Sequence, residues 1–255
     1  MAWSFKKKLP GFHAPTVLDQ IEAVVYAHLK PLGFRRHGRT LHRFVSGDIS
    51  QVVNFQYHYY RFCVNVGIRI PECEERTFTL PVNDKKYYHE YNCQIRSRLG
   101  AVKGCRDVWF DLKKDPAKIA ERICRELDEY VLPAFDVLSS REQILAHRRD
   151  YPNFDTMSRH QILLEEAFIY GCRGDLETAK ERFDAYYQRA VAIYEKERTE
   201  GHLVWLRMGE TIVAKDKNGE TQRITAKFPR YIRIYSPNKI HLEYLDELAK
   251  KLGIR

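Results

Sequence analysis

The clearest pattern in the chain is a strict alternation of apolar and polar positions over residues 62–70. The even positions are all apolar: Phe62, Val64, Val66, Ile68 and Ile70. The odd positions between them are Cys63, Asn65, Gly67 and Arg69. Because successive side chains of a strand point to opposite faces, the segment predicts a strand whose even face lies in the core. Gly67, on the other face, predicts the close approach of a bulky group or a β-bulge.

Other elements before residue 150 follow from the same kind of pattern. Apolar residues at helical spacing predict a helix from an N-cap at Thr16 to Leu29, which Pro31 and Gly33 stop. After it come an exposed basic turn, strands over 40–46 and 49–57, and less legible sequence over 71–106 with a short strand over 77–80. A strand over 107–112 precedes a helix capped by Asp115 and another that starts near Ser140.

The C-terminal part is predicted to be mainly helical. A helical hairpin spans 158–198 with its break at Gly174-Asp175; its spacing resembles one tetratricopeptide repeat, but no second copy follows, so we favour an ordinary hairpin. Asn218-Gly219 predicts a β-hairpin over about 211–226 with Lys217 opposite Glu220. A helix over 239–252 closes the chain.

Together these elements predict the α+β class. We expect an antiparallel sheet of about four to six strands in residues 1–150, packed by the N-terminal helix and later helices. Residues 151–255 form the helical extension, which carries the helical hairpin, the short β-hairpin and the terminal helix.

Composition adds constraints on partners and compartment. A net charge of +9 permits an acidic partner, but the basic residues are spread along the chain and indicate a solvated surface. No secretory signal and no apolar run of about 20 residues is present, so we expect no membrane partner. Six cysteines without Cys-x-x-Cys pairs predict reduced thiols, a cytoplasmic location and no metal site.

Searches for catalytic motifs return nothing: hydrolase, metalloprotease, P-loop and dinucleotide fingerprints are all lacking, and no cofactor is predicted. Polar residues of the predicted sheet and its basic turn are therefore candidates for binding rather than catalysis. If the odd face of the third strand is open, it offers a polar surface to an anion or a carboxylate; if it is covered, its amides need a buried network. These candidates are Arg35, Arg36, Arg39, Arg43, Asn54, Gln56, His58, Asn65 and Arg69.

Three functions compete. The first is a non-enzymatic module that binds another protein, in the manner of an adaptor or immunity protein, because catalytic signatures are lacking. The second is nucleic-acid binding, in which basic residues contact phosphates and tyrosines stack on bases. Its residues would be Lys6, Lys7, Lys8, Arg35, Arg36, Arg39, Tyr57, Tyr59 and Tyr60. The third is an enzyme of unrecognised type centred on the Arg, His and Tyr groups of the sheet. We prefer the first.

Several short motifs resemble a bacterial family known as domain-of-unknown-function family 4304. They lie mainly within residues 15–150, with one more in the tail: Leu32-Gly33-Phe34-Arg35-Arg36, Gly38-Arg39-Thr40, Arg43, Val53-Asn54-Phe55-Gln56, Phe62-Cys63-Val64-Asn65-Val66-Gly67-Ile68, Leu132-Pro133-Ala134-Phe135 and His241-Leu242-Glu243-Tyr244-Leu245. The resemblance implies an α+β fold. It implies no reaction, cofactor or catalytic residue.

Overall fold

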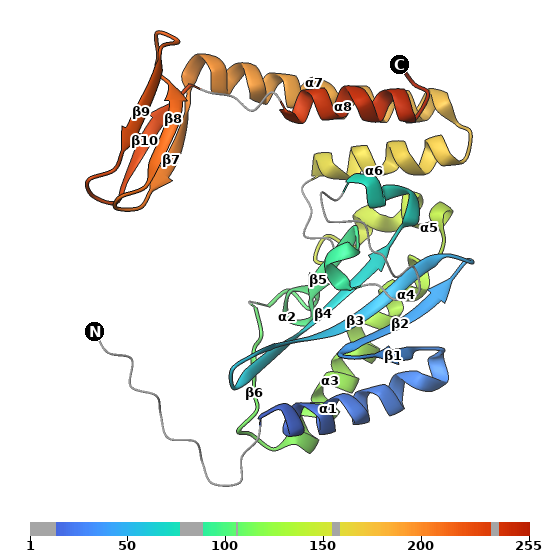
Figure 1. Ribbon diagram of the computed structural model, residues 1–255. Helices are drawn as coiled ribbons and strands as arrows, with labels where there is room; N and C mark the ends of the chain where they lie inside the picture. The colour runs from blue at the N-terminus through green and yellow to red at the C-terminus, as the bar shows by residue number, and fades with distance from the viewer. Residues whose placement is uncertain (1–13, 77–88, 106, 155–158, 236–239) are drawn as a thin grey trace. The chain divides into compact units, whose positions relative to one another are not determined.

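The computed structural model describes residues 14–76, 89–105, 107–154, 159–235 and 240–255 (Figure 1). The chain divides into two compact units, Met1–Ser158 and Arg159–Arg255. The described residues of the first unit form helices around one antiparallel sheet, and those of the second form three helices and four short strands. The predicted α+β class is confirmed.

Helix α1 (Ala14–Leu29) opens the first unit. Its buried stripe of Leu18, Ile21, Val25 and Leu29 follows the helical period that the sequence shows. Thr16 lies inside the helix, so the prediction that it is the N-cap is wrong; apolar periodicity located the helix but not its first residue. The helix ends in a 3-10 turn, η1 (Lys30–Leu32), and Gly33 adopts the left-handed φ of 89° that terminates it.

Six strands form the sheet, and every pairing is antiparallel. Five lie in the order β1-β2-β3-β4-β5, and the sixth pairs with the far end of β4. Their bounds are β1 (Arg35–His37), β2 (Thr40–Val45), β3 (Ile49–His58), β4 (Arg61–Arg69), β5 (Ile95–Arg98) and β6 (Phe110–Asp111). The basic turn predicted before the first strand is instead the exposed edge strand β1, because Gly38, at φ 56°, folds it back onto β2.

Strand β4 carries the predicted core face. Phe62, Val64, Val66, Ile68 and Ile70 are at most 1% exposed, as the alternation predicts. On the other face a Cβ at Gly67 would lie 2.7 Å from Cβ of Cys93, which confirms the predicted close approach.

Several helices follow the sheet, after η2 (Pro71–Arg76), η3 (Glu90–Asn92) and α2 (Leu99–Val102). Asp115 caps α3 (Pro116–Glu126), as predicted, by accepting the backbone N–H of Ala117. A π-helical turn (Leu127–Val131) leads through Pro133 into α4 (Leu132–Val137), and α5 (Arg141–His147) ends in η5 (Arg148–Asp150). Helix α3 packs against α1 (Figure 1). Its residues Ile119 and Ile123 are buried. The strand predicted over 77–80 lies outside the described residues.

The second unit begins with the predicted helical hairpin. It consists of α6 (Arg159–Cys172) and α7 (Leu176–Glu200), and Asp175 caps the second helix through the N–H of Thr178. The two helices pack through Ala167, Ala179 and Phe183, all buried. Helix α8 (Ile240–Lys251) packs against α7 and closes the chain.

Four strands stand between α7 and α8: β7 (His202–Leu206), β8 (Thr211–Lys215), β9 (Thr221–Thr225) and β10 (Arg230–Ile234). β7 pairs with β10 and β8 with β9; the first of these pairs was not predicted. The predicted register of the hairpin is wrong by one residue, since Lys215 pairs with Thr221 and Ile212 with Ile224. A three-residue loop replaces the two-residue loop because Asp216 pairs with Glu220 and Gly219 adopts φ 84°.

Candidate functional site

A chain of amide side chains crosses the odd face of β4 and its neighbour β3. Asn54 of β3 stands opposite Asn65 of β4, and Gln56 stands opposite Cys63. The Asn65 Nδ2 lies 3.5 Å from the Asn54 Oδ1 and 3.1 Å from the Gln56 Oε1. Asn54 in turn donates to the Thr40 hydroxyl at 3.0 Å. Asn54 and Asn65 are buried, at 8% and 5% exposure, and their amides hydrogen-bond as a buried network requires, whereas Gln56 is exposed.

The network opens into a pocket at its β5 end. The Asn65 Nδ2 also lies 3.3 Å from the carboxylate of Glu90, which the 3-10 turn η3 holds above the strand. The pocket beside this pair has a volume of about 420 Å³. Its walls combine amides, guanidinium groups and carboxylates from several elements, namely Gln56, Asn65, Glu90, Arg96, Ser97, Arg98, Ala101 and Asp107.

Strand β5 supplies the positive charge of the pocket. Its register places Arg98 opposite Asn65 and Arg96 opposite Gly67, so both guanidinium groups belong to the amide face. Arg98 forms an ion pair with Asp107, and its guanidinium lies 5.3 Å from the ring of Trp109. The Trp109 indole donates to the same Asp107 carboxylate at 2.9 Å. Two cations and two carboxylates thus line one pocket, and the contacts among Arg98, Asp107 and Trp109 hold part of this set in place.

Cys63 is the nucleophilic side chain closest to this network, since its thiol contacts Gln56 and Asn65. Burial raises the pKa of the Cys63 thiol to about 11, and the nearby Arg98 opposes this only in part. Burial also raises the pKa of Cys93, which lies against Gly67. Both groups are protonated at neutral pH and serve here as hydrogen-bond donors to oxygen acceptors.

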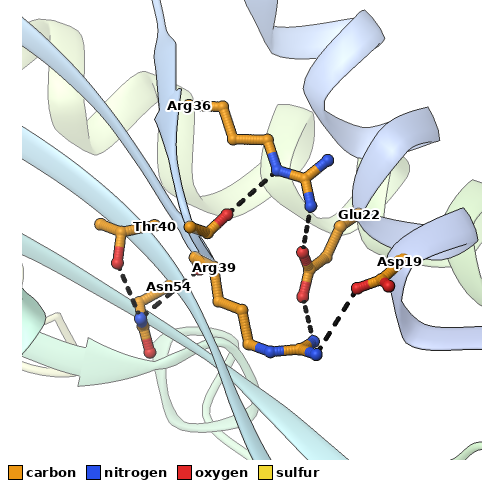
Figure 2. A network of polar contacts seen from close by, with 7 residues as sticks. Asp19, Glu22, Arg36, Arg39, Thr40 and Asn54 are labelled. Atoms are coloured by element: carbon orange, nitrogen blue, oxygen red, sulfur yellow. Dashed lines mark hydrogen bonds and ion pairs between the residues drawn. The ribbon is translucent and has the colours of Figure 1, made fainter. Parts of the chain in front are cut away.

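Two of the arginines proposed from the sequence have a structural partner (Figure 2). Glu22 of α1, only 1% exposed, accepts from Arg36 at 2.7 Å and from Arg39 at 2.6 Å. Burial raises the pKa of the Glu22 carboxyl, while the charges of Arg39 and Arg36 oppose that rise. The pair of arginines therefore ties the β1–β2 hairpin to α1.

The remaining candidates are not brought to the pocket. Arg43 lies opposite Gln51, on the face towards the helices, where it contacts Asp136 at 2.7 Å. Arg69 is on the amide face but opposite Ser50, and it is buried. His58 packs against Tyr59 and Trp109, and Arg35 is exposed on the edge strand. Of the nine candidates, Gln56 and Asn65 line the pocket and Asn54 supports them.

Four charged residues of the pocket were missed: Glu90, Arg96, Arg98 and Asp107. They lie in or directly after the segment that gave no legible pattern. The one available signal was the short alternation Ile95-Arg96-Ser97-Arg98, which fits a four-residue strand with basic residues on one face.

Within the residues that the structure describes, no group of three or more His, Cys, Asp or Glu side chains is placed to hold a metal ion. None of the described helices combines the length and the apolar character that a membrane span requires.

Comparison with known proteins identifies a family whose model matches part of the first unit. Residues 25–137 match the family model described as Domain of unknown function (DUF4304), which confirms the resemblance drawn from the short motifs. This range contains β1 to α4 and every residue that lines the pocket. No curated protein and no solved structure matches the chain.

Proposed function

We propose that the protein is a non-enzymatic protein-binding module, and that the pocket beside Asn65 receives a charged segment of a partner polypeptide. The observation that carries the proposal is the content of the pocket. It combines two side-chain amides, two guanidinium groups and two carboxylates around a volume of about 420 Å³.

These groups match the chemistry of a polypeptide. A primary amide donates and accepts hydrogen bonds as a peptide bond does, so the exposed Gln56 suits a main chain that passes over the sheet. Arg96 suits a carboxylate, and Glu90 suits a cationic side chain. The mixture of charges favours a segment that carries both signs over a simple anion.

The side chains near the pocket give less support to an enzyme. The Cys63 thiol retains its proton at neutral pH because burial raises its pKa to about 11, so it would be a weak nucleophile. The Asp107 carboxylate already accepts from Arg98 and Trp109, and these contacts suit a positioning role better than proton transfer.

Nucleic-acid binding through the basic turn is likewise less favoured. Glu22 compensates Arg36 and Arg39, and Asp19 adds a second carboxylate 3.5 Å from Arg39. Charges that are neutralised within the fold contribute little to the release of counterions from a phosphate backbone.

The location that we propose is the bacterial cytoplasm. All six cysteines lie in described parts of the chain and none is in a disulfide; two of them, Cys105 and Cys172, are exposed. Thiols in this state fit a reducing compartment.

The test is affinity enrichment from native lysate followed by quantitative mass spectrometry, with variants of matched charge change. Arg96→Glu reverses a charge in the pocket. Lys118→Glu makes the same change of net charge at an exposed position of α3. We expect a partner that the wild type and Lys118→Glu retain and that Arg96→Glu loses.

A second pocket variant separates charge from fold. Glu90→Gln keeps an acceptor for the Asn65 amide and removes the negative charge, so it should weaken the same partner without a change in thermal unfolding. The proposal would be contradicted if all variants retained the same proteins, or if the wild type retained no protein.

A further inference from the structure

The strand pair β7–β10 of the second unit has one apolar face that is left exposed. Alternation along both strands turns Leu206 and Ile234 inward, at 1% and 8% exposure. The residues between them point outward: Leu203 is 57% exposed, Trp205 48% and Tyr231 66%. Large exposed apolar side chains that gather on one face of a sheet indicate a binding surface rather than a folding requirement.

Two aromatic rings form the centre of this face. Trp205 and Tyr231 are directly paired across the strands, and their ring centroids are 4.8 Å apart with 55° between the planes. Two adjoining turns extend the surface. They are tied together by the hydrogen bond from Gly209 N to Ala226 O, and they carry Met208 and Phe228, which are 70% and 73% exposed. A shallow hollow beside Trp205 is lined also by Arg207, Met208 and Glu210.

Cations gather at one end of the strand pair, with Arg207 on the face of the rings and Arg230 on the other face. Arg207, Lys227 and Arg230 are exposed, and no ion pair or side-chain hydrogen bond joins them to any residue that the structure describes. Residues 202–235 contain seven Lys and Arg against three Asp and Glu. This uncompensated charge differs from that of the β1–β2 hairpin, where carboxylates neutralise the arginines.

We propose that the face formed by Leu203, Trp205, Arg207 and Tyr231, with Phe228 of the adjoining turn, binds single-stranded nucleic acid. Bases would stack on Trp205 and Tyr231, because every base has a flat face that an exposed ring can cover. Phosphates would contact Arg207 and Lys227 at the end of the strand pair. Aromatic residues and arginine also form the centres of protein interfaces, but the excess of unpaired cations favours a polyanion. This surface is independent of the pocket beside Asn65.

The test is fluorescence anisotropy of the full-length chain with a labelled oligouridine of about 15 nucleotides, long enough to span more than one such site. The matching oligothymidine distinguishes RNA from DNA as the source of the ligand. We expect binding at about 50 mM salt that weakens steeply by about 200 mM, as phosphate contacts release counterions.

Variants on the face should separate stacking from charge. Trp205→Ala and Tyr231→Ala should each weaken binding about tenfold, whereas Trp205→Phe and Tyr231→Phe should stay within about threefold because a ring remains. Arg207→Ala should lower the slope of the salt dependence by roughly 0.7 to 1. Lys217→Ala, which removes one charge from the β8–β9 turn of the same unit, is the charge-matched control and should leave the slope nearly unchanged.

The outcomes are distinguishable because the substituted side chains are exposed and the variants should unfold at the same temperature as the wild type. Lack of binding by the wild type at low salt overturns the proposal, as does equal affinity of the wild type and Trp205→Ala. Binding to vesicles that contain phosphatidylserine, lost in the same variants and without binding to either oligonucleotide, overturns it in favour of a membrane surface. Failure of the pocket variants in the enrichment experiment leaves these measurements unaffected.

Discussion

Asn65 is the residue at which the fold and the candidate site meet. Its side-chain nitrogen has two hydrogens and three acceptors within 3.5 Å, on Asn54, Gln56 and Glu90. All donor capacity of this amide is therefore used inside the protein, while its neighbours Arg96 and Arg98 line the open side of the pocket. Asn65 therefore contributes to the structure of the pocket floor and leaves the selection of a ligand to its neighbours.

Gly67, two positions further along the same face, gives a prediction about packing. A Cβ there would lie 2.7 Å from Cβ of Cys93 and 2.8 Å from its sulfur, so Gly67→Ala forces backbone or Cys93 to move. We expect a loss of about 1–3 kcal/mol in the free energy of unfolding, which urea denaturation followed by circular dichroism measures.

A double variant tests the cause. Cys93→Gly removes both clashing atoms, so Gly67→Ala should cost less in the Cys93→Gly background than in the wild type. Cys93→Ala removes only the sulfur and should relieve less of the strain. Equal cost of Gly67→Ala in all three backgrounds would show that the clash with Cys93 is not the reason.

At the residue scale, the buried face of β4 and the close approach at Gly67 could be predicted from the sequence. Both follow from local properties, namely the alternation of apolar residues and the lack of a side chain. The sequence did not predict that Glu22 holds Arg36 and Arg39. That contact depends on where α1 lies against the β1–β2 hairpin, which no local pattern records.

At the scale of elements, Arg141 joins three segments that are distant in sequence. From the start of α5 it donates to Asp48, in the turn between β2 and β3, and to Glu72 of η2, at distances of 2.7–3.0 Å. The Glu72 side chain is 5% exposed and that of Asp48 54%. One guanidinium therefore compensates a buried carboxylate and fixes a surface turn.

Substitution of this residue should destabilise the first unit. Arg141→Met leaves the Glu72 carboxylate buried without the guanidinium, and we expect a loss of about 2–4 kcal/mol in the free energy of unfolding at pH 7. Hydrogen bonds from Arg141 lower the pKa of Asp48 below its usual value of 3.8. A lowered carboxyl pKa contributes stability that is present above 3.8 and is lost as the pH falls through the lower value of the folded state.

The difference between wild type and Arg141→Met should therefore narrow as the pH falls from roughly 5 to 2. Urea denaturation at several pH values measures it. Arg125→Met, at an exposed position of α3, serves as the control and should change stability by less than about 0.5 kcal/mol at any pH. A constant difference between wild type and Arg141→Met across this range would contradict the linkage to Asp48.

Elements with a long regular pattern were predicted well, and short ones were not. Strands β3 and β4 and helices α3, α6 and α7 have enough alternation, periodicity or capping to stand out. β5 has four residues, and β7 and β10 have five each, too few for a period to rise above chance. The hairpin register failed because an Asn-Gly pair fits a three-residue loop as well as a two-residue one.

At the scale of the whole molecule, the six thiols are distributed over both units and differ in exposure. Cys63, Cys73 and Cys93 are buried in the first unit, Cys124 is half-buried, and Cys105 and Cys172 are exposed. Since a thiol reacts as the thiolate, burial protects it both by excluding reagent and by raising its pKa.

We therefore expect two thiols to react rapidly with Ellman's reagent at about pH 8, where an ordinary exposed thiol is partly ionised. Mass spectrometry should map them to Cys105 and Cys172, and all six should react in denaturant. The Cys105→Ser/Cys172→Ser variant should lose the rapid phase. Rapid labelling of Cys63 in the native protein would contradict its burial beneath the amide network.

The amide network also has a consequence for how the strands find one another. Residues 49–55 of β3 and most of β4 are buried on both faces, but one face carries valine, phenylalanine and isoleucine and the other carries Asn54 and Asn65. A slip of one residue between them would turn these amides into the apolar core and leave each without its partner. The buried amides of Asn54 and Asn65 therefore disfavour misaligned pairing during folding, so residues beside the pocket also select the register of β3 and β4.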